Sequence, residues 1–209
     1  SYPSGFAGGL VPEAMPESRG RGLAITKTNE PPTWSDATLA VYRLADGKAD
    51  NISSQARAGD ALPTGEYVLC TILKAPVQAW HGDKYYVDLL RPGVTEKFIE
   101  ITLEAYRKHF GEEFGQCIPG SFTDEPEIRP AGGLPWTPTL PESFEERWRY
   151  SLLDHLPSLI LKVGDWKKVR HDYFQLLIEL FGQRWGKPMH DYCEKHNLDF
   201  TGHYWEHQW

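Results

Sequence analysis

The sequence predicts an α/β fold, and two observations lead to this prediction. The second half alternates helix and strand patterns: a helical pattern after Pro92, a strand pattern at Cys117–Phe122, a longer helix from about Val169 and a strand pattern at Leu198–His203. The first half instead carries short apolar segments separated by turn residues. We therefore expect one α/β domain over residues 1–209, with a small β-rich insertion at about residues 23–75.

Composition limits the classes of protein to which the chain can belong. Its 209 residues, 40% of them hydrophobic, suffice for one globular core. A net charge of -7 offers no basic surface for nucleic acid, and no apolar run approaches the roughly 20 residues of a membrane-spanning helix. We expect neither nucleic acid nor a membrane as partner. The three widely spaced cysteines indicate buried free thiols, with no disulfide framework.

The β-rich insertion follows from three apolar segments. Leu23–Thr26 and Leu39–Leu44 are the first two, and an Asp46-Gly47 turn follows the second. Tyr67–Leu73 is the third. Residues 1–22 are rich in Gly and Pro, so we expect a loop without secondary structure there.

Helices are expected between and after the strand patterns. Apolar residues at i, i+4, i+7 and i+11 predict a helical face made of Ile99, Leu103, Tyr106 and Phe110. The segment Pro130–Pro141 is too rich in proline for regular structure, and short helices follow it at Glu142–Tyr150 and Leu152–Leu156. Pro188 is expected to kink the longer helix or to begin a second one. The apolar face of the longer helix is formed by Phe174, Leu177, Phe181 and Trp185.

The acidic motif Asp124-Glu125-Pro126 follows the strand pattern at Cys117–Phe122 directly. Proline fixes the backbone after the two carboxylates and ends strand pairing, so Glu125 is expected at the carboxyl end of a strand. In α/β barrels that end carries the chemistry. The alternative is an ordinary loop carboxylate before a turn.

A second cluster, His203-Tyr204-Trp205-Glu206-His207, follows the strand pattern at Leu198–His203. Two strand ends therefore each carry a glutamate, Glu125 and Glu206. The letters also match H-x-x-E-H, a zinc-protease pattern in which His203 and His207 would bind the metal beside Glu206. A polar cap at a strand end, with no chemical role, is the structural alternative for each histidine.

Taken together, several motifs resemble the catalytic barrel of α-L-rhamnosidase-like glycoside hydrolases of family 106 and their uncharacterised bacterial relatives. Each motif is weak alone, and their order and spacing carry the resemblance. The matching segments are Tyr2–Gly9, Tyr86–Pro92, Phe98–Tyr106, Phe122–Pro126, Leu134–Pro138, Val169–Tyr173 and Thr201–His203.

The resemblance implies part of a (β/α)8 TIM barrel that removes a terminal rhamnose-like sugar from a poly- or oligosaccharide with inversion at the anomeric carbon. Glu125 matches the family's D-E-P glutamate and would be the general acid, oriented by Asp124. Glu206 is the candidate for the second catalytic carboxylate, although the base could also come from a strand outside these residues. A calcium ion near the sugar and a periplasmic or secreted location are implied as well, with no calcium ligand assigned. The rest of the barrel would lie outside this chain, which starts without an initiator Met.

Physical chemistry agrees with a carbohydrate substrate. Glycoside hydrolysis needs one protonated and one ionised carboxyl group, and Phe122 and Trp136 near Glu125 would disfavour its ionised form. Aromatics make up 13% of the chain, and flat rings bind sugar faces. The candidate sugar platform is Trp80, Trp136, Tyr204 and Trp205, with His81, His203 and His207 as partners for hydroxyl groups.

Two other functions stay open. A non-catalytic carbohydrate-binding protein on a degenerate barrel would use the same aromatic residues and tolerate the loss of either carboxylate. A metal-dependent hydrolase would need His203, Glu206 and His207 on one helical face. Turnover after Glu125→Gln separates the first alternative from the leading one, and zinc content separates the second.

Overall fold

The computed structural model describes residues 5–204. The chain forms two compact units, which we describe separately. The first unit comprises Ser1–Gly20, Lys74–Ala131 and Glu179–Trp209, and the second comprises Arg21–Leu73 and Gly132–Ile178. None of the helices in the described part of the chain combines the length and the apolar character needed to cross a lipid bilayer.

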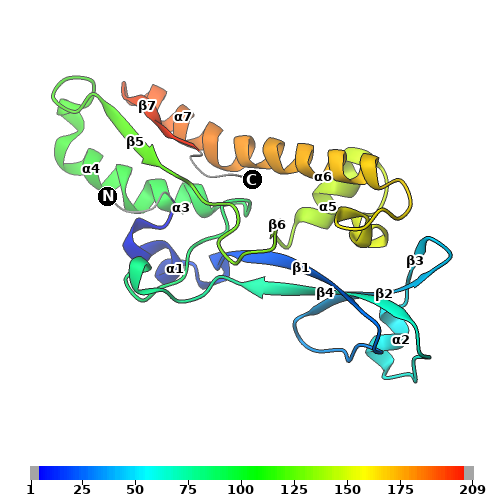
Figure 1. Cartoon of the computed structure of the whole chain (residues 1–209). Helices are drawn as coiled ribbons and strands as arrows, with labels where there is room; N and C mark the ends of the chain where they lie inside the picture. Colours follow the sequence, from blue (N-terminus) through cyan, green and yellow to red (C-terminus); the bar gives the residue numbers. More distant parts are fainter. Residues whose placement is uncertain (1–4, 205–209) are drawn as a thin grey trace. The chain divides into compact units, whose positions relative to one another are not determined.

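The second unit contains a five-stranded antiparallel sheet with the strand order β3-β2-β4-β1-β6 (Figure 1). Its strands are β1 (Arg21–Thr28), β2 (Thr38–Ala45), β3 (Lys48–Asn51), β4 (Glu66–Lys74) and β6 (Leu134–Trp136). The strands expected at Leu23–Thr26, Leu39–Leu44 and Tyr67–Leu73 are confirmed as parts of β1, β2 and β4.

Turn residues explain the hairpin between β2 and β3. Asp46 and Gly47 both have positive φ, 49° and 73°, which is the backbone conformation of a type I′ turn. Such a turn matches the twist of two antiparallel strands. The expected Asp46-Gly47 turn is therefore confirmed.

One local expectation in this unit is wrong. The proline-rich segment Pro130–Pro141 contains the short strand β6, in which Trp136 pairs with Arg21 and Leu134 with Leu23 of β1. Pro135 is tolerated because β6 is an edge strand of the sheet. The pairing partner β1 lies more than a hundred residues earlier in the chain, so proline content alone could not reveal it.

The helices of the second unit pack through buried polar contacts. They are α2 (Ser53–Ala58), α5 (Leu140–Trp148) and the first part of α6 (Trp166–Phe181), with 3-10 turns η5 (Leu152–Asp154) and η6 (Leu156–Leu159). The Tyr173 hydroxyl donates to the Pro135 carbonyl, and the Trp148 indole N–H donates to the Asp172 carbonyl at 3.1 Å. These bonds satisfy groups that would be costly to bury alone.

The first unit is mainly helical. Its elements are η1 (Ala7–Gly9), α1 (Leu10–Ala14), η2 (Pro16–Ser18), η3 (Ala79–His81), α3 (Val94–Ile101), α4 (Leu103–Phe110), η4 (Gly111–Glu113), a π-helical turn η7 (Gly182–Gly186) and α7 (Lys187–Lys195). The loop expected over residues 1–22 is corrected, because η1, α1, η2 and the start of β1 lie there. The helical face predicted around Ile99 is also incomplete, since Tyr106 and Phe110 are exposed.

Two parallel strands complete the first unit: β5 (Gly120–Asp124) and β7 (Asp199–His203), which lie side by side in Figure 1. They are paired in register from Gly120 with Asp199 to Asp124 with His203. Phe114, Cys193 and Leu198 form a buried cluster beside them. The close approach depends on Gly202, where a Cβ atom would lie 1.9 Å from the Thr123 carbonyl oxygen.

The expected (β/α)8 TIM barrel is contradicted. Such a barrel consists of parallel strands that are each followed by a helix, whereas the larger sheet here is antiparallel. Its strands β2 and β3 are joined by a two-residue turn, which leaves no room for a helical crossover. Among the named strands of residues 5–204, β5 and β7 are the pair that runs parallel. The α/β alternation predicted from the sequence therefore describes local elements and not the barrel.

Candidate functional site

The candidate site lies where β5 and β7 end. Asp124 is the last residue of β5 and His203 the last of β7, and their side chains approach to 3.6 Å between Oδ1 and Nδ1. The Glu125 backbone N–H donates to the His203 carbonyl oxygen at 2.9 Å. The parallel pairing thus brings together three residues predicted from two separate motifs.

Glu125 has a special backbone conformation. Its φ is 40°, in the left-handed region that residues with a side chain rarely adopt. Pro126, which is buried, follows directly and fixes the next part of the chain. Such a conformation persists only where its surroundings impose it, and here the bond to His203 and the buried Pro126 lie on either side of Glu125.

The environment of the acid differs from the expected one. Phe122 contacts the His203 ring edge-on, with centroids 5.3 Å apart, but Phe122 is 61% exposed. Trp136 is only 4% exposed and belongs to the sheet of the second unit. Trp136 is therefore a core residue of its own sheet, and Phe122 is not an enclosing wall.

The loop after the acidic motif reaches a cluster of aromatic rings. The Glu127 N–H donates to the Tyr86 hydroxyl oxygen at 3.3 Å. The Tyr86 ring lies 6.0 Å from Phe6, nearly parallel to it, and 5.5 Å from the His81 ring. One of the predicted sugar-binding histidines is thus connected through Tyr86 to the loop that follows Glu125.

The His81 ring packs within this aromatic cluster. Burial against the rings lowers its pKa below the ordinary value. Its Nδ1 atom is buried and has no hydrogen-bond partner among the described residues. Because Nδ1 is closed to solvent, a contact with a sugar hydroxyl would have to use the other ring nitrogen. The neighbouring Trp80 is 82% exposed, so its ring is open to solvent.

The remaining predicted residues lie at the end of the chain. Tyr204 packs edge-on against Phe181 and Phe200, with centroid distances of 6.3 and 6.1 Å, and burial raises its pKa. Trp205, Glu206 and His207 lie outside the described residues. The second catalytic carboxylate and the H-x-x-E-H zinc pattern therefore stay predictions.

One group of side chains in the described part of the chain has the spacing of metal ligands. Within residues 5–204, the side chains of His, Cys, Asp and Glu make one group of three that could hold a metal ion, namely His190, Asp191 and Glu194 on α7. All three are exposed, and Asp191 already forms an ion pair with Lys187. Calcium prefers six to eight oxygen ligands, and this group contains an imidazole nitrogen and two carboxylates.

Sequence reasoning did not assign a role to Phe6 or Tyr86. Both belong to segments that carried the family resemblance, Tyr2–Gly9 and Tyr86–Pro92. Their common signal is an aromatic residue next to Gly-rich or apolar loop sequence, which also describes many core residues. Only the folded chain shows that they hold His81.

Comparison with known proteins gives a match among solved structures. No protein-family model matches the chain, and no curated protein matches it. Among solved structures, a rhamnosidase from Novosphingobium sp. PP1Y is similar, with a TM-score of 0.51 and 16% sequence identity. The match covers 79% of this chain and 17% of the rhamnosidase, so the chain spans about a sixth of that protein's length. At this identity the likeness shows a related fold alone.

Proposed function

We propose that the chain is part of a glycoside hydrolase that removes a terminal, rhamnose-like sugar from a poly- or oligosaccharide. The observation that carries the proposal is the meeting of Asp124, Glu125 and His203 at adjoining strand ends. The fold likeness to a rhamnosidase supports the choice of reaction class.

In this proposal Glu125 is the general acid. It donates a proton to the glycosidic oxygen as the bond to the leaving group breaks. Asp124 and His203 position it, because their side chains meet at the two paired strand ends on which the acid is held. A second carboxylate must activate water, and we assign this role to Glu206.

The sugar would lie against residues near the two strand ends. Trp80 offers an open ring face, and we assign a hydroxyl contact to the ring nitrogen of His81 other than the buried Nδ1. We assign further hydroxyl and stacking contacts to His203, Tyr204, Trp205 and His207. Trp136 is not part of this proposal, since its side chain is buried in the sheet.

The test is hydrolysis of a panel of aryl glycosides, led by the α-L-rhamnoside, with the full-length protein. Glu125→Gln should lower turnover by about 10²-fold or more, because the amide is nearly isosteric but cannot donate the proton. Glu127→Gln is the matched control, since Glu127 lies two residues away and is exposed. Circular dichroism checks that both variants stay folded.

The outcomes separate the alternatives. Loss of turnover in Glu125→Gln alone supports the proposal. Full activity in that variant contradicts the assignment of Glu125. No turnover with any glycoside, together with measurable sugar binding, would replace the hydrolase with a carbohydrate-binding protein.

A further inference from the structure

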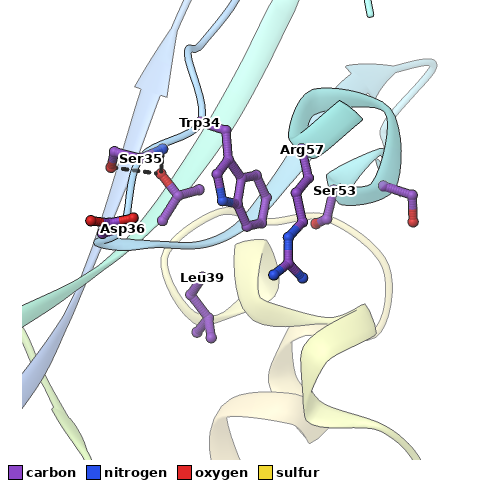
Figure 2. A pocket seen from close by; sticks show the side chains of 8 residues that line it. Trp34, Ser35, Asp36, Leu39, Ser53 and Arg57 are labelled. Atoms are coloured by element: carbon purple, nitrogen blue, oxygen red, sulfur yellow. Dashed lines mark hydrogen bonds between the residues drawn. The ribbon is translucent and has the colours of Figure 1, made fainter. Parts of the chain in front are cut away.

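A pocket of about 430 Å³ lies in the second unit (Figure 2), whereas Asp124, Glu125 and His203 belong to the first. It is bounded by the segment that leads into β2 and by α2. Its lining residues are Trp34, Ser35, Asp36, Thr38, Leu39, Ser53, Ser54 and Arg57.

Trp34 provides the pocket with a fixed aromatic face. The indole packs against the buried cluster of Val41, Ala56 and Tyr67, which restrains the ring. The side chain as a whole is half-buried. A ring that is immobilised before binding loses little conformational entropy when a flat ligand stacks on it.

Arg57 supplies a cation beside this ring. Its guanidinium carbon lies 5.8 Å from the Trp34 ring centroid. Arg57 is exposed, and within residues 5–204 it forms no ion pair. Figure 2 shows its guanidinium directed into the pocket, with Asp36 on the other side of Trp34. The planar fork is therefore available for a carboxylate, which it can bind through two hydrogen bonds.

The polar wall of the pocket is already ordered. The Thr38 hydroxyl oxygen accepts from the Ser35 backbone N–H at 3.0 Å and also contacts the Ser35 hydroxyl at 3.0 Å. The Ser53 hydroxyl accepts from the Val41 N–H at 3.0 Å. These bonds hold both edges of the pocket in place, so the ligand would not have to organise them.

We propose that this pocket binds a sugar ring that carries a carboxylate, a hexuronic acid residue. The ring face would stack on Trp34, the carboxylate would pair with Arg57, and the sugar hydroxyls would face the serine side chains. A neutral sugar would leave the guanidinium unused, and a simple anion would leave the indole face unused. The choice of a sugar among flat carboxylates rests on the proposed function. The pocket would then bind an acidic residue of the polysaccharide chain.

The experiment is titration of the ¹⁵N-labelled, full-length protein with trigalacturonic acid, followed by nuclear magnetic resonance. The indole N–H signal of Trp34, assigned with Trp34→Phe, should shift on binding. Arg57→Gln should weaken binding by about tenfold or more, the value expected for loss of a charged hydrogen bond. The methyl ester of the same trisaccharide should bind the unaltered protein about tenfold more weakly for the same reason.

Arg43→Gln is the matched control, because Arg43 is an exposed arginine on β2 that does not line the pocket. It should bind trigalacturonic acid as the unaltered protein does. Equal affinity in Arg57→Gln, equal binding of the methyl ester, or shifts confined to signals other than Trp34 would each overturn the proposal. Turnover of aryl glycosides is measured on the same protein. Binding of trigalacturonic acid without turnover of any aryl glycoside would contradict the proposed function alone. Turnover without binding of trigalacturonic acid would contradict the pocket proposal alone.

Discussion

The Glu125 N–H and the His203 carbonyl oxygen are joined by a 2.9 Å hydrogen bond, one step beyond the last paired residues of β5 and β7. The bond fixes the backbone of the candidate acid directly to the neighbouring strand end. A change in the pairing of these two strands should therefore be felt at Glu125, even where the substituted residue has no chemical role.

Asp124→Asn tests the positioning role of the Asp124–His203 pair. We expect turnover of the aryl glycoside to fall by about tenfold, because the amide replaces the carboxylate oxygen that contacts the His203 ring at the strand ends. The free energy of unfolding should change by less than about 1 kcal/mol, since both side chains are about half exposed. Asp191→Asn, which removes another exposed paired carboxylate, is the control. Unchanged turnover in Asp124→Asn would contradict the positioning role.

Gly202→Ala should destabilise the first unit by about 2 kcal/mol or more, because the new Cβ atom would collide with the Thr123 backbone. The φ of 142° at this position adds strain for any residue with a side chain. Gly182→Ala is the control, since a Cβ atom there meets no atom within 4 Å. Urea unfolding followed by circular dichroism measures both. Equal stability of the two variants would show that the strand pair tolerates the extra atom.

Tyr150→Phe should make stability less dependent on pH. Burial alone would raise the pKa of Asp172, but hydrogen bonds from Lys168, His171 and Tyr150 outweigh it and hold that pKa below its ordinary value. A carboxyl group whose pKa is lowered by folding stabilises the fold at any pH above its pKa in the unfolded chain, about 3.9. This contribution is lost as the pH falls through the pKa of the folded state. We therefore expect a loss of about 1.5–3 kcal/mol at pH 7, and a smaller loss at about pH 3.5.

The control for this experiment is Tyr67→Phe, because the Tyr67 hydroxyl donates to a neutral acceptor, the Pro63 carbonyl. The loss in free energy of unfolding caused by Tyr67→Phe should be nearly the same at pH 7 and at about pH 3.5. Urea unfolding from pH 7 to pH 3 measures the two variants. A cost of Tyr150→Phe that stays constant over that range would show that the Asp172 charge is not what this hydroxyl stabilises.

The cysteines should differ in reactivity. Cys117 is exposed, while Cys70 and Cys193 are buried, and burial raises the pKa of Cys70 to about 12. Since the thiolate is the reactive form, iodoacetamide should label Cys117 in the folded protein and the other two only in denaturant. Mass spectrometry of the digested protein gives the sites. Labelling of Cys70 under native conditions would mean that the β2–β4 pairing opens readily.

Local signals in the sequence predicted many elements correctly. The apolar segments of β1, β2 and β4, the Asp46-Gly47 turn and the strand ending at His203 all follow from short-range patterns. The expectation that all three cysteines are buried was wrong for Cys117, which is exposed. An apolar run next to a helix does not reveal which of its residues face solvent.

The barrel was wrong because strand patterns do not specify partners or directions. Nothing local to Leu134–Trp136 indicates that it pairs with β1, and this pairing also buries Trp136. At the site, the two motifs ending in Glu125 and His203 could be recognised separately from sequence. Their contact could not, because it depends on a parallel register between residues about eighty positions apart.

The π-helical turn at Gly182–Gly186 has a consequence for the phase of the helix that follows it. Phe181, Trp185, Met189 and Cys193 recur every four residues, and all four are buried. In an α-helix a four-residue repeat drifts by about 40° at each step, so a stripe of this spacing would wind away from the core. The wider turn corrects that drift within one step. A deletion of one residue inside Gly182–Gly186 would rotate the positions now held by Met189 and Cys193 by about 100°. The helix α7 would stay intact, but a different face of it would pack against β7.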